Sequence, residues 1–326
     1  MGGYNYKLSI IIPMYNAEKY IANCLNSILC SDLLEREYEV IIVNDGSHDN
    51  GPNIAQDFCT KHKNFRYLTQ ENKGQSVARN YGIEEAHGEY LWFVDSDDKI
   101  DNRINALLVK IEELGKPDVF SFYLQYISEE GKFLTKAFRF PGVYNLLMKG
   151  RDAIVSGYQP SSVCVFFMKK KFIDDLKLRF YPGIYHQDSE FSYRMMAYAK
   201  SVFFSDYVPY IYIKHKNTVV TSTLPEKVEK RLMDDITIIK SFEDLSKEFK
   251  ETDLTLYKTI KKHCDGMLLG IVYSLYKNKE GLYNARIAQN VLTRLEAEHL
   301  YPMKIGLKPI KRNLLKLFLN NKKMIY

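Results

Sequence analysis

Short apolar runs alternate with amphipathic segments through residues 1–125, and this alternation limits the fold more than any other feature of the sequence. The apolar runs predict strands over 8–12, 40–43, 65–69 and 90–94. The segments between them carry apolar residues at helical spacing and predict helices over 17–29, 52–63 and 75–86. Runs that are apolar on both faces and separated by helices are typical of a parallel sheet that helices cover on both sides. The sequence therefore predicts an α/β fold with a mostly parallel sheet flanked by helices.

The remainder of the chain is less regular at first and then helical. Strands are predicted over 118–127, 163–168 and 201–213, and a helix over 189–199. From Pro225 onward the spacing of apolar residues predicts helices over 226–249, 254–276 and 284–299. We therefore expect an α/β domain over residues 1–222 and a helical C-terminal region over residues 223–326.

The formal net charge of +6 is concentrated at the C-terminal end. Residues 303–326 carry seven basic residues and no acidic residue, so the rest of the chain is almost neutral. A nucleic-acid-binding protein would normally spread basic residues over a binding face, so we exclude nucleic acid as a partner. Apolar and basic residues alternate in this tail, which suits contact with an anionic membrane surface. An ordinary amphipathic helix over about residues 310–320, packed on the body, explains the same pattern.

Cysteine usage and the absence of long apolar runs predict the compartment. The five cysteines are scattered without a Cys-x-x-Cys pair, which favours free thiols over disulfides or structural zinc. The seven histidines show no zinc-binding spacing. No run approaches the roughly 20 apolar residues that a membrane span needs, and residues 1–7 do not resemble a signal peptide. We therefore expect a cytoplasmic protein, with peripheral contact at the inner face of the cell membrane if the tail binds lipid.

Acidic residues follow the predicted strand 90–94 directly, as Asp95-Ser96-Asp97-Asp98. Ligands of open α/β sheets bind beyond the carboxyl ends of the strands. Two carboxylates at positions i and i+2 of a loop can converge on one hard divalent cation, for which Mg²⁺ and Mn²⁺ are the usual choices. An Asp-x-Asp alone fits a polar turn with a helix cap equally well. Its position directly after an apolar strand is what favours a cation site.

Two other segments offer groups for a nucleotide. Asp45 follows the strand 40–43 and can accept a hydrogen bond from a base or a ribose, although a turn through Gly46 explains it as well. Gly74 precedes the helix 75–86, whose first amides are free to meet an anion. Arg79 lies one turn into that helix, where it either reaches a nucleotide or faces solvent.

These segments follow one another in a recognisable order: Leu8–Asn16, Glu39–Ser47, Asn72–Gly82 and Tyr90–Asp98. Together they resemble the family 2 glycosyltransferases, which transfer sugars from nucleotide diphosphates with inversion. The resemblance is dense over residues 7–103 and becomes thinner toward residue 222. It implies an A-type glycosyltransferase fold, with residues 1–222 as the catalytic domain and the helical region as an appendage.

The resemblance also implies the nucleotide-sugar-binding residues. By this analogy they are Pro13, Tyr15, Asp45, Arg79, Asp95, Ser96, Gln187 and Lys214. Asp45 would bind the base with Arg79 beside it, while Asp95 and Asp97 would hold the ribose and a Mn²⁺ or Mg²⁺ ion on the diphosphate. His215 would ligate that metal or contact phosphate, unless it belongs to a solvated basic loop. Relatives commonly have arginine at the position of Lys214. Lysine can neutralise phosphate but lacks the bidentate fork of the guanidinium.

The same resemblance points to Asp188 as the catalytic base. Relatives usually open a late helix with a Glu-Asp pair whose aspartate is the base, and here the pair reads Gln187-Asp188. Because glutamine cannot ionise, Gln187 cannot tune the base electrostatically, but it can hydrogen-bond an acceptor hydroxyl. Glu190 and His186 are the alternative bases, and a simple helix N-cap is the alternative role of Asp188.

The implied activity is that of an inverting hexosyltransferase. It would move a sugar from a nucleotide diphosphate donor, a UDP-sugar, to a glycan or glycolipid acceptor in bacterial surface polysaccharide synthesis. A catalytically weak glycosyltransferase-like scaffold or subunit and a nucleotidyltransferase are the alternatives. Residues 13–17 lack the glycine-rich basic loop of a nucleotidyltransferase and the Gly-x-Gly-x-x-Gly of a dehydrogenase. A glycosidase would use two carboxylates without a nucleotide.

Overall fold

The computed structural model describes residues 4–137, 144–215, 224–277, 285–303 and 320. The chain divides into two compact units, which are described separately below. The α/β unit consists of residues 1–183 and 187–215, and the helical unit of residues 184–186 and 216–326. The domain boundary expected between residues 222 and 223 falls outside the described residues.

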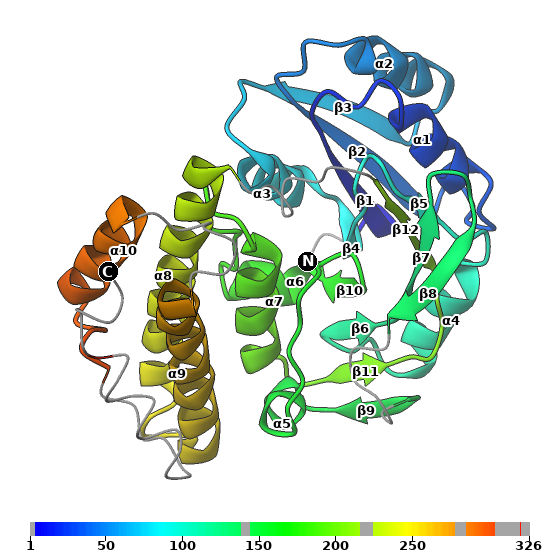
Figure 1. Cartoon of the computed structure of the whole chain (residues 1–326). Helices are drawn as coiled ribbons and strands as arrows, with labels where there is room; N and C mark the ends of the chain where they lie inside the picture. Colours follow the sequence, from blue (N-terminus) through cyan, green and yellow to red (C-terminus); the bar gives the residue numbers. More distant parts are fainter. Residues whose placement is uncertain (1–3, 138–143, 216–223, 278–284, 304–319, 321–326) are drawn as a thin grey trace. The chain divides into compact units, whose positions relative to one another are not determined.

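An eight-stranded sheet forms the centre of the α/β unit (Figure 1). Its strands are β1 (Tyr6–Met14), β2 (Tyr38–Asp45), β3 (Phe65–Gln70), β4 (Gly88–Phe93), β6 (Val119–Ser121), β9 (Leu146–Met148), β10 (Phe166–Lys169) and β11 (Val202–Phe204). They lie in the order β3-β2-β1-β4-β10-β6-β11-β9. The first four are parallel to one another, whereas β10 is antiparallel to both of its neighbours and β9 is antiparallel to β11. The expected mostly parallel sheet is therefore confirmed.

The central strands are buried because helices cover them. All residues of β2 are buried, as are those of β1 from Leu8 onward. The connections are α1 (Ile21–Leu29), α2 (Gly51–Lys61) and α3 (Gln75–Glu85), and α3 packs on both β1 and β2. Gly82 lets α3 approach the sheet closely, since a Cβ atom there would overlap the side chain of Ile11. The first turn of α3 meets the loop that follows β4, where Gln75 donates a hydrogen bond to Asp95.

Two predicted strands are each divided between two sheets. The run 118–127 forms β6 and then β7 (Leu124–Ser128), and the run 201–213 forms β11 and then β12 (Tyr210–Lys214). β6 pairs with β11, and β7 pairs with β12 in a second sheet of order β5-β12-β7-β8, with β5 (Lys99–Ile100) and β8 (Phe133–Ala137). The segments that follow β6 and β11 leave the large sheet together and pair again in the second sheet. Apolar periodicity does not reveal this change of sheet. The second sheet brings β12 beside the acidic loop that follows β4.

The remaining helices of the α/β unit are α4 (Asn105–Glu113), α5 (Gly150–Val155), α6 (Lys170–Asp175) and α7 (Gln187–Tyr198). The last of these begins two residues earlier than the predicted helix 189–199. Gln187 and Asp188 therefore both lie in the first turn of α7.

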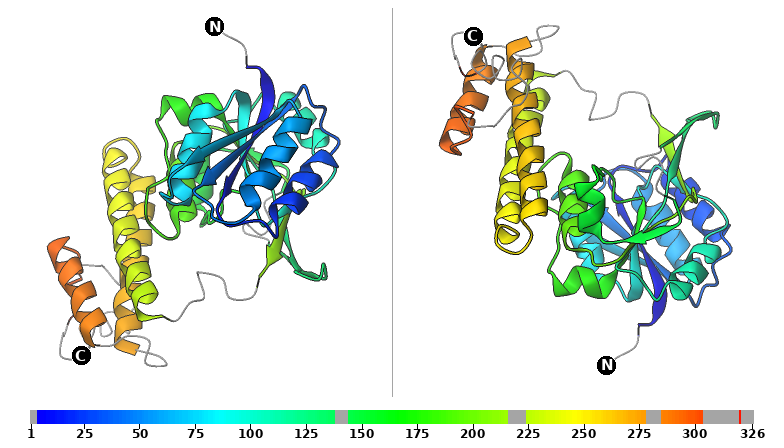
Figure 2. Two further views of the ribbon diagram at one scale, coloured as in Figure 1. Left: turned by 90° about the horizontal axis from the view of Figure 1, so that it is seen from above. Right: turned by 90° about the horizontal axis from the view of Figure 1, so that it is seen from below.

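Three helices make up the described part of the helical unit: α8 (Pro225–Glu248), α9 (Leu254–Lys277) and α10 (Ala285–Ala297). α8 and α9 lie side by side, and α10 packs on α8 through a buried stripe that includes Val291 (Figure 2). The predicted C-terminal helices of this unit are confirmed. No helix within the described ranges is long and apolar enough to cross a membrane. The amphipathic helix expected over 310–320 lies outside these ranges, apart from Asn320.

Candidate active site

Arg79 of α3 joins two acidic side chains that are far apart in the sequence. Its Nη2 donates a hydrogen bond to Asp95 Oδ1 at 2.8 Å, and its Nη1 donates to Asp188 Oδ1. The guanidinium is 1% exposed, and it lies 5.9 Å from the ring centre of Phe93 and 5.3 Å from that of Phe180. A buried charge is tolerated when it is paired, and here two carboxylates share one guanidinium. The structure thus brings together the predicted base, one predicted metal and ribose ligand, and Arg79.

The electrostatics of this group suit proton transfer. Burial raises the pKa of Asp188 above its ordinary value, while Arg79 opposes that rise. Burial lowers the pKa of Arg79, but the carboxylates of Asp188 and Asp95 outweigh it, so the guanidinium stays charged. A carboxylate with a raised pKa is a stronger proton acceptor, which is what a general base needs.

A second set of hydrogen bonds joins the same three elements. Ser76 Oγ donates to Gln187 Oε1, and Gln187 Nε2 donates to Gln75 Oε1 at 2.8 Å. Gln75 Nε2 in turn donates to Asp95 Oδ1 at 3.1 Å. Gln75 and Ser76 were not predicted as site residues. Their spacing from Arg79, four and three residues along one helix face, is the signal that could have identified them.

Of the two alternative bases, Glu190 is already engaged. It is 1% exposed, and its two oxygens accept hydrogen bonds from Arg194 at 2.6 and 2.8 Å. A carboxylate held in this way within α7 serves packing. Asp188 therefore remains the better candidate on α7.

Asp97 faces His215 at the end of β12. Asp97 Oδ2 lies 3.5 Å from His215 Nε2, and Glu129 Oε1 lies 2.7 Å from His215 Nδ1. The ring of Tyr20 lies against the imidazole, with the two centres 4.6 Å apart. Burial raises the pKa of Asp97, and the negative charge of nearby Asp95 adds to that effect. Lys214, the neighbour of His215, is exposed.

The pair of Asp97 and His215 fits a divalent cation. Two ligands that each lie about 2.1 Å from one ion are separated by about 3 to 3.5 Å. The separation of Asp97 Oδ2 and His215 Nε2, 3.5 Å, falls in that range. In the part of the chain that the structure describes, no three acidic, histidine or cysteine side chains already surround one point as a metal site would. A metal held here would therefore draw at least one further ligand from a neighbouring side chain or from the substrate.

Asp98 has a structural contact that the sequence did not indicate. It is 2% exposed, and it accepts hydrogen bonds from the Tyr210 hydroxyl at 2.6 Å and from the Ile213 amide at 2.8 Å. The amide of Asp95 donates to the same hydroxyl at 3.1 Å. Asp98 therefore fastens β12 to the acidic loop, in which Ser96 remains partly exposed.

Asp45 holds the loop that leads into α3. Its carboxylate is 4% exposed and accepts hydrogen bonds from the amides of Lys73 and Gly74, both at 2.8 Å. The side chain of Gln70 donates to it at 2.7 Å. Gly74 has φ +89°, a conformation that glycine adopts without strain. A contact of Asp45 with the nucleotide base stays a prediction.

The loops after β1 and β2 are joined near the other predicted nucleotide residues. Pro13 is buried near the end of β1, and Tyr15, just beyond the strand, is 46% exposed. The amide of Asn16 donates to Ser47 Oγ at 3.0 Å. This link keeps the two strand ends together, and Tyr15 offers an exposed ring beside them.

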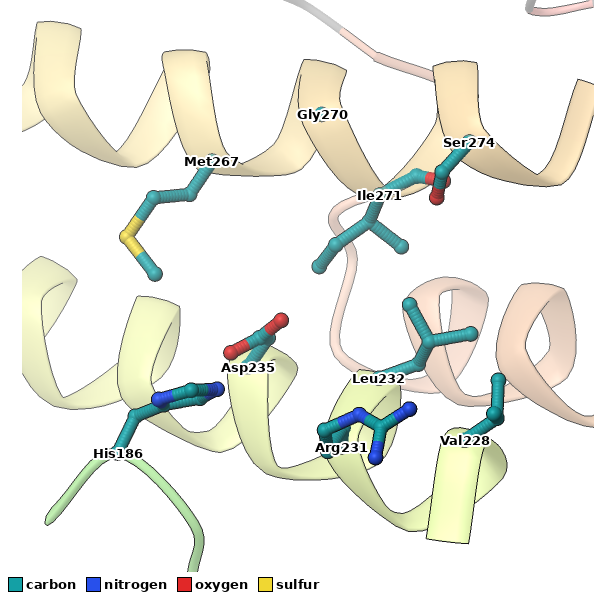
Figure 3. A pocket seen from close by; sticks show the side chains of 9 residues that line it. All are labelled: His186, Val228, Arg231, Leu232, Asp235, Met267, Gly270, Ile271 and Ser274. Carbon is teal, nitrogen blue, oxygen red and sulfur yellow. The ribbon is translucent and has the colours of Figure 1, made fainter. Parts of the chain in front are cut away.

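A pocket of about 410 Å³ lies within the helical unit, between α8 and α9 (Figure 3). His186 lines it with φ +57°, together with Asp235 and apolar side chains that include Leu232 and Ile271. Burial raises the pKa of Asp235, and the positive potential of His186 opposes that rise. His186, the other alternative base, thus has an acidic neighbour of its own in this unit.

The family model of glycosyl transferase family 2 matches residues 9–174. The glycosyltransferase YibD of Escherichia coli is 27% identical over 299 residues, which cover 88% of this chain and 84% of that protein. Glycosyltransferases of Streptococcus pneumoniae and Bacillus subtilis are 37–39% identical over 120–128 residues. The Bacillus subtilis minor teichoic acid biosynthesis protein GgaB is 37% identical over 98 residues, 30% of this chain and 11% of that protein. The match covers only 18–42% of the length of the Streptococcus pneumoniae and Bacillus subtilis glycosyltransferases.

Solved structures give the same fold. TarS 1–349 of S. aureus in complex with UDP matches with a TM-score of 0.68 and 21% identity, over 98% of this chain and 88% of that one. The mannosyltransferase PcManGT of Pyrobaculum calidifontis, solved with GDP-Man and Mn²⁺, matches with a TM-score of 0.53 and 14% identity. That match covers 97% of this chain and 85% of the other. The A-type glycosyltransferase fold is therefore confirmed, and the chain belongs to glycosyl transferase family 2.

Proposed function

We propose that this family 2 protein is an inverting hexosyltransferase that uses a nucleotide diphosphate sugar, with a UDP-sugar as donor. The observation that carries the proposal is the guanidinium of Arg79, which joins Asp95 of the acidic loop to Asp188 of α7. One side chain thereby couples the donor side of the site to the base. The complexes of TarS with UDP and UDP-GlcNAc support a uridine nucleotide, and PcManGT with GDP-Man supports a nucleotide sugar in general.

In the proposed reaction Asp188 accepts the proton of the acceptor hydroxyl as its oxygen attacks the anomeric carbon. The bond between that carbon and the diphosphate oxygen breaks on the opposite face, so the configuration inverts. General base catalysis of this kind contributes about 10²–10⁴-fold to the rate. Arg79 orients Asp188, and Gln187, held by Ser76, is available to hydrogen-bond the acceptor.

The residues also fit a divalent cation on the donor side. Asp97 and His215 would hold Mn²⁺ or Mg²⁺ together with Asp95 and the diphosphate, as the 3.5 Å separation of the first two allows. When bound there, the ion would stabilise the negative charge that develops on the departing nucleoside diphosphate. Asp45 would bind the base, Pro13, Tyr15 and Ser96 would line the nucleotide pocket, and Lys214 would face the phosphates.

The acceptor is proposed to be a glycan or glycolipid of bacterial surface polysaccharide synthesis. The relative named for minor teichoic acid biosynthesis supports this class. We place the reaction in the cytoplasm, at the inner face of the membrane, with residues 303–326 as the membrane contact. The seven basic residues of that segment support the proposal, although most of the segment lies outside the described residues.

The release of nucleoside diphosphate tests the function directly. The full chain is incubated with a panel of UDP-sugars and GDP-sugars in Mn²⁺, without acceptor, and free UDP or GDP is measured. We expect slow hydrolysis of one UDP-sugar that depends on the metal. If no donor in the panel is hydrolysed and none raises the melting temperature, a scaffold or subunit role becomes the better account.

A further inference from the structure

We propose that Glu129 is a positioning residue, which fixes the ring of His215 so that Nε2 faces a divalent cation. The inference rests on the proposed metal-dependent donor site. It adds a residue from the turn after β7, which neither the motifs nor the resemblance included.

The hydrogen bond to Glu129 determines which imidazole nitrogen is available. Glu129 Oε1 lies 2.7 Å from His215 Nδ1. An ionised carboxylate only accepts hydrogen bonds, so Nδ1 must carry the proton. In the neutral ring Nε2 then keeps its lone pair, which is the form of histidine that binds metals.

The Nε2 atom of His215 is placed to bind a cation together with Asp97. It is buried, it has no hydrogen-bond partner among the residues that the structure describes, and Asp97 Oδ2 lies 3.5 Å from it. A buried nitrogen without a partner is costly. A cation between Nε2 and the carboxylate of Asp97 would satisfy both groups at once.

The fold places Glu129 beside His215 through strand register. β7 and β12 are parallel neighbours, and Ser128 is the partner of Lys214. Glu129 and His215 directly follow the last residues of the two strands, so they leave the sheet side by side. Asp98 fixes the Ile213 amide two residues earlier, and the ring of Tyr20 lies against the imidazole. The imidazole is therefore held from several directions, and the hydrogen bond to Glu129 fixes which nitrogen faces Asp97.

Binding of Mn²⁺ measured by electron paramagnetic resonance tests the inference without a turnover assay. The free-ion signal is titrated with the full chain, alone and with UDP, for the wild type and for Glu129→Ala and Glu129→Gln. We expect Glu129→Ala to weaken Mn²⁺ binding by about 10–100-fold, as loss of a carboxylate behind a metal-bound histidine does in other proteins. Glu129→Gln keeps an acceptor oxygen and should weaken binding less.

Two controls separate positioning from general electrostatics. Glu251→Ala removes the same charge from an exposed position in the helical unit and should leave binding unchanged. In a His215→Ala background, Glu129→Ala should have no further effect, because the two residues act as a unit. Melting temperatures without metal should be similar for all variants, since the Glu129 side chain is 41% exposed.

The outcomes distinguish this inference from the proposed function. If Asp97→Ala abolishes Mn²⁺ binding while Glu129→Ala binds as the wild type does, the role of Glu129 is refuted and the metal site stands. If Glu129→Ala weakens Mn²⁺ binding as much in the His215→Ala background as it does in the wild type, positioning is also refuted. If the wild type binds no Mn²⁺ with or without UDP, the metal site and the role of Glu129 both fail.

Discussion

A buried, long-range cation of the α/β unit contrasts with an exposed, local ion pair of the helical unit. In the α/β unit, Arg79 is 1% exposed and pairs with carboxylates 16 and 109 residues away in the sequence. In the helical unit, ion pairs such as Lys247 with Asp244 lie within one helix, with both side chains about two-thirds exposed. A buried ion pair carries a desolvation penalty that only good geometry and further hydrogen bonds offset, whereas an exposed local pair contributes little to stability.

The family match follows the same division. The matched residues 9–174 all belong to the α/β unit. The described part of the helical unit has buried apolar side chains and a pocket with His186 and Asp235, and it lies outside the family match. The family match and the proposed catalytic residues therefore lie together in the α/β unit.

The largest effect on this comparison is expected from Arg79→Met. The substitution leaves the carboxylates of Asp95 and Asp188, which are 24% and 23% exposed, without their buried cation. Removing one partner of a fully buried ion pair costs about 3–5 kcal/mol, so we expect a loss toward the lower end of that range. The free energy of unfolding in urea measures this loss. The matched control is Arg286→Met, whose side chain is 72% exposed in a pair with Glu229 of the helical unit.

For Arg286→Met we expect a change within about 0.5 kcal/mol. Equal stability losses for the two arginine variants would remove the contrast between the units. If Arg79→Met were as stable as the wild type, the buried cluster would not be organised by its guanidinium.

A smaller effect is expected from Tyr210→Phe. The change removes the hydroxyl that donates to Asp98 and accepts from the Asp95 amide, so a buried carboxylate loses a partner at a cost of about 1–3 kcal/mol. Chemical denaturation measures it. Tyr273→Phe in the helical unit, where the ring is 39% exposed, is the control and should change stability little. A neutral Tyr210→Phe would mean that Asp98 does not depend on this hydroxyl to hold β12.

The smallest effect on stability is expected from removal of residues 304–326, which keeps the buried Tyr301 and Met303 and separates membrane contact from catalysis. If the basic and apolar side chains of the tail bind lipid, a variant ending at Met303 should lose co-sedimentation with anionic vesicles and keep nucleotide binding. Vesicles of neutral lipid serve as the control for charge. Equal co-sedimentation of the two chains would assign the membrane contact to another surface or exclude it.

The sequence predicted most elements of the fold because periodicity reports which face of an element is buried. Strands β1 to β4 and helices α8 to α10 lie within a few residues of their predicted bounds. Periodicity does not report which partner a strand chooses. The run 118–127 therefore was not recognised as two strands in two sheets, and its division at Phe122 and Tyr123 depends on tertiary pairing.

The candidate site was predictable in its residues and less so in its contacts. Motif order identified Asp95, Arg79 and Asp188, but their ion pairs join α3 to α7 across 109 residues, which no local pattern encodes. Gln75 and Glu129 were missed for the same reason: their partners lie on other elements.

The most direct test of the account is to measure donor binding and turnover separately for Asp188→Asn. Asparagine keeps the shape of the side chain but accepts a proton poorly. The donor is the UDP-sugar that the wild type hydrolyses in the panel described above. For Asp188→Asn we expect unchanged affinity for this donor by calorimetry and a kcat lowered by about 10²–10⁴-fold. Near wild-type turnover in this variant would contradict the assignment of Asp188 as the base.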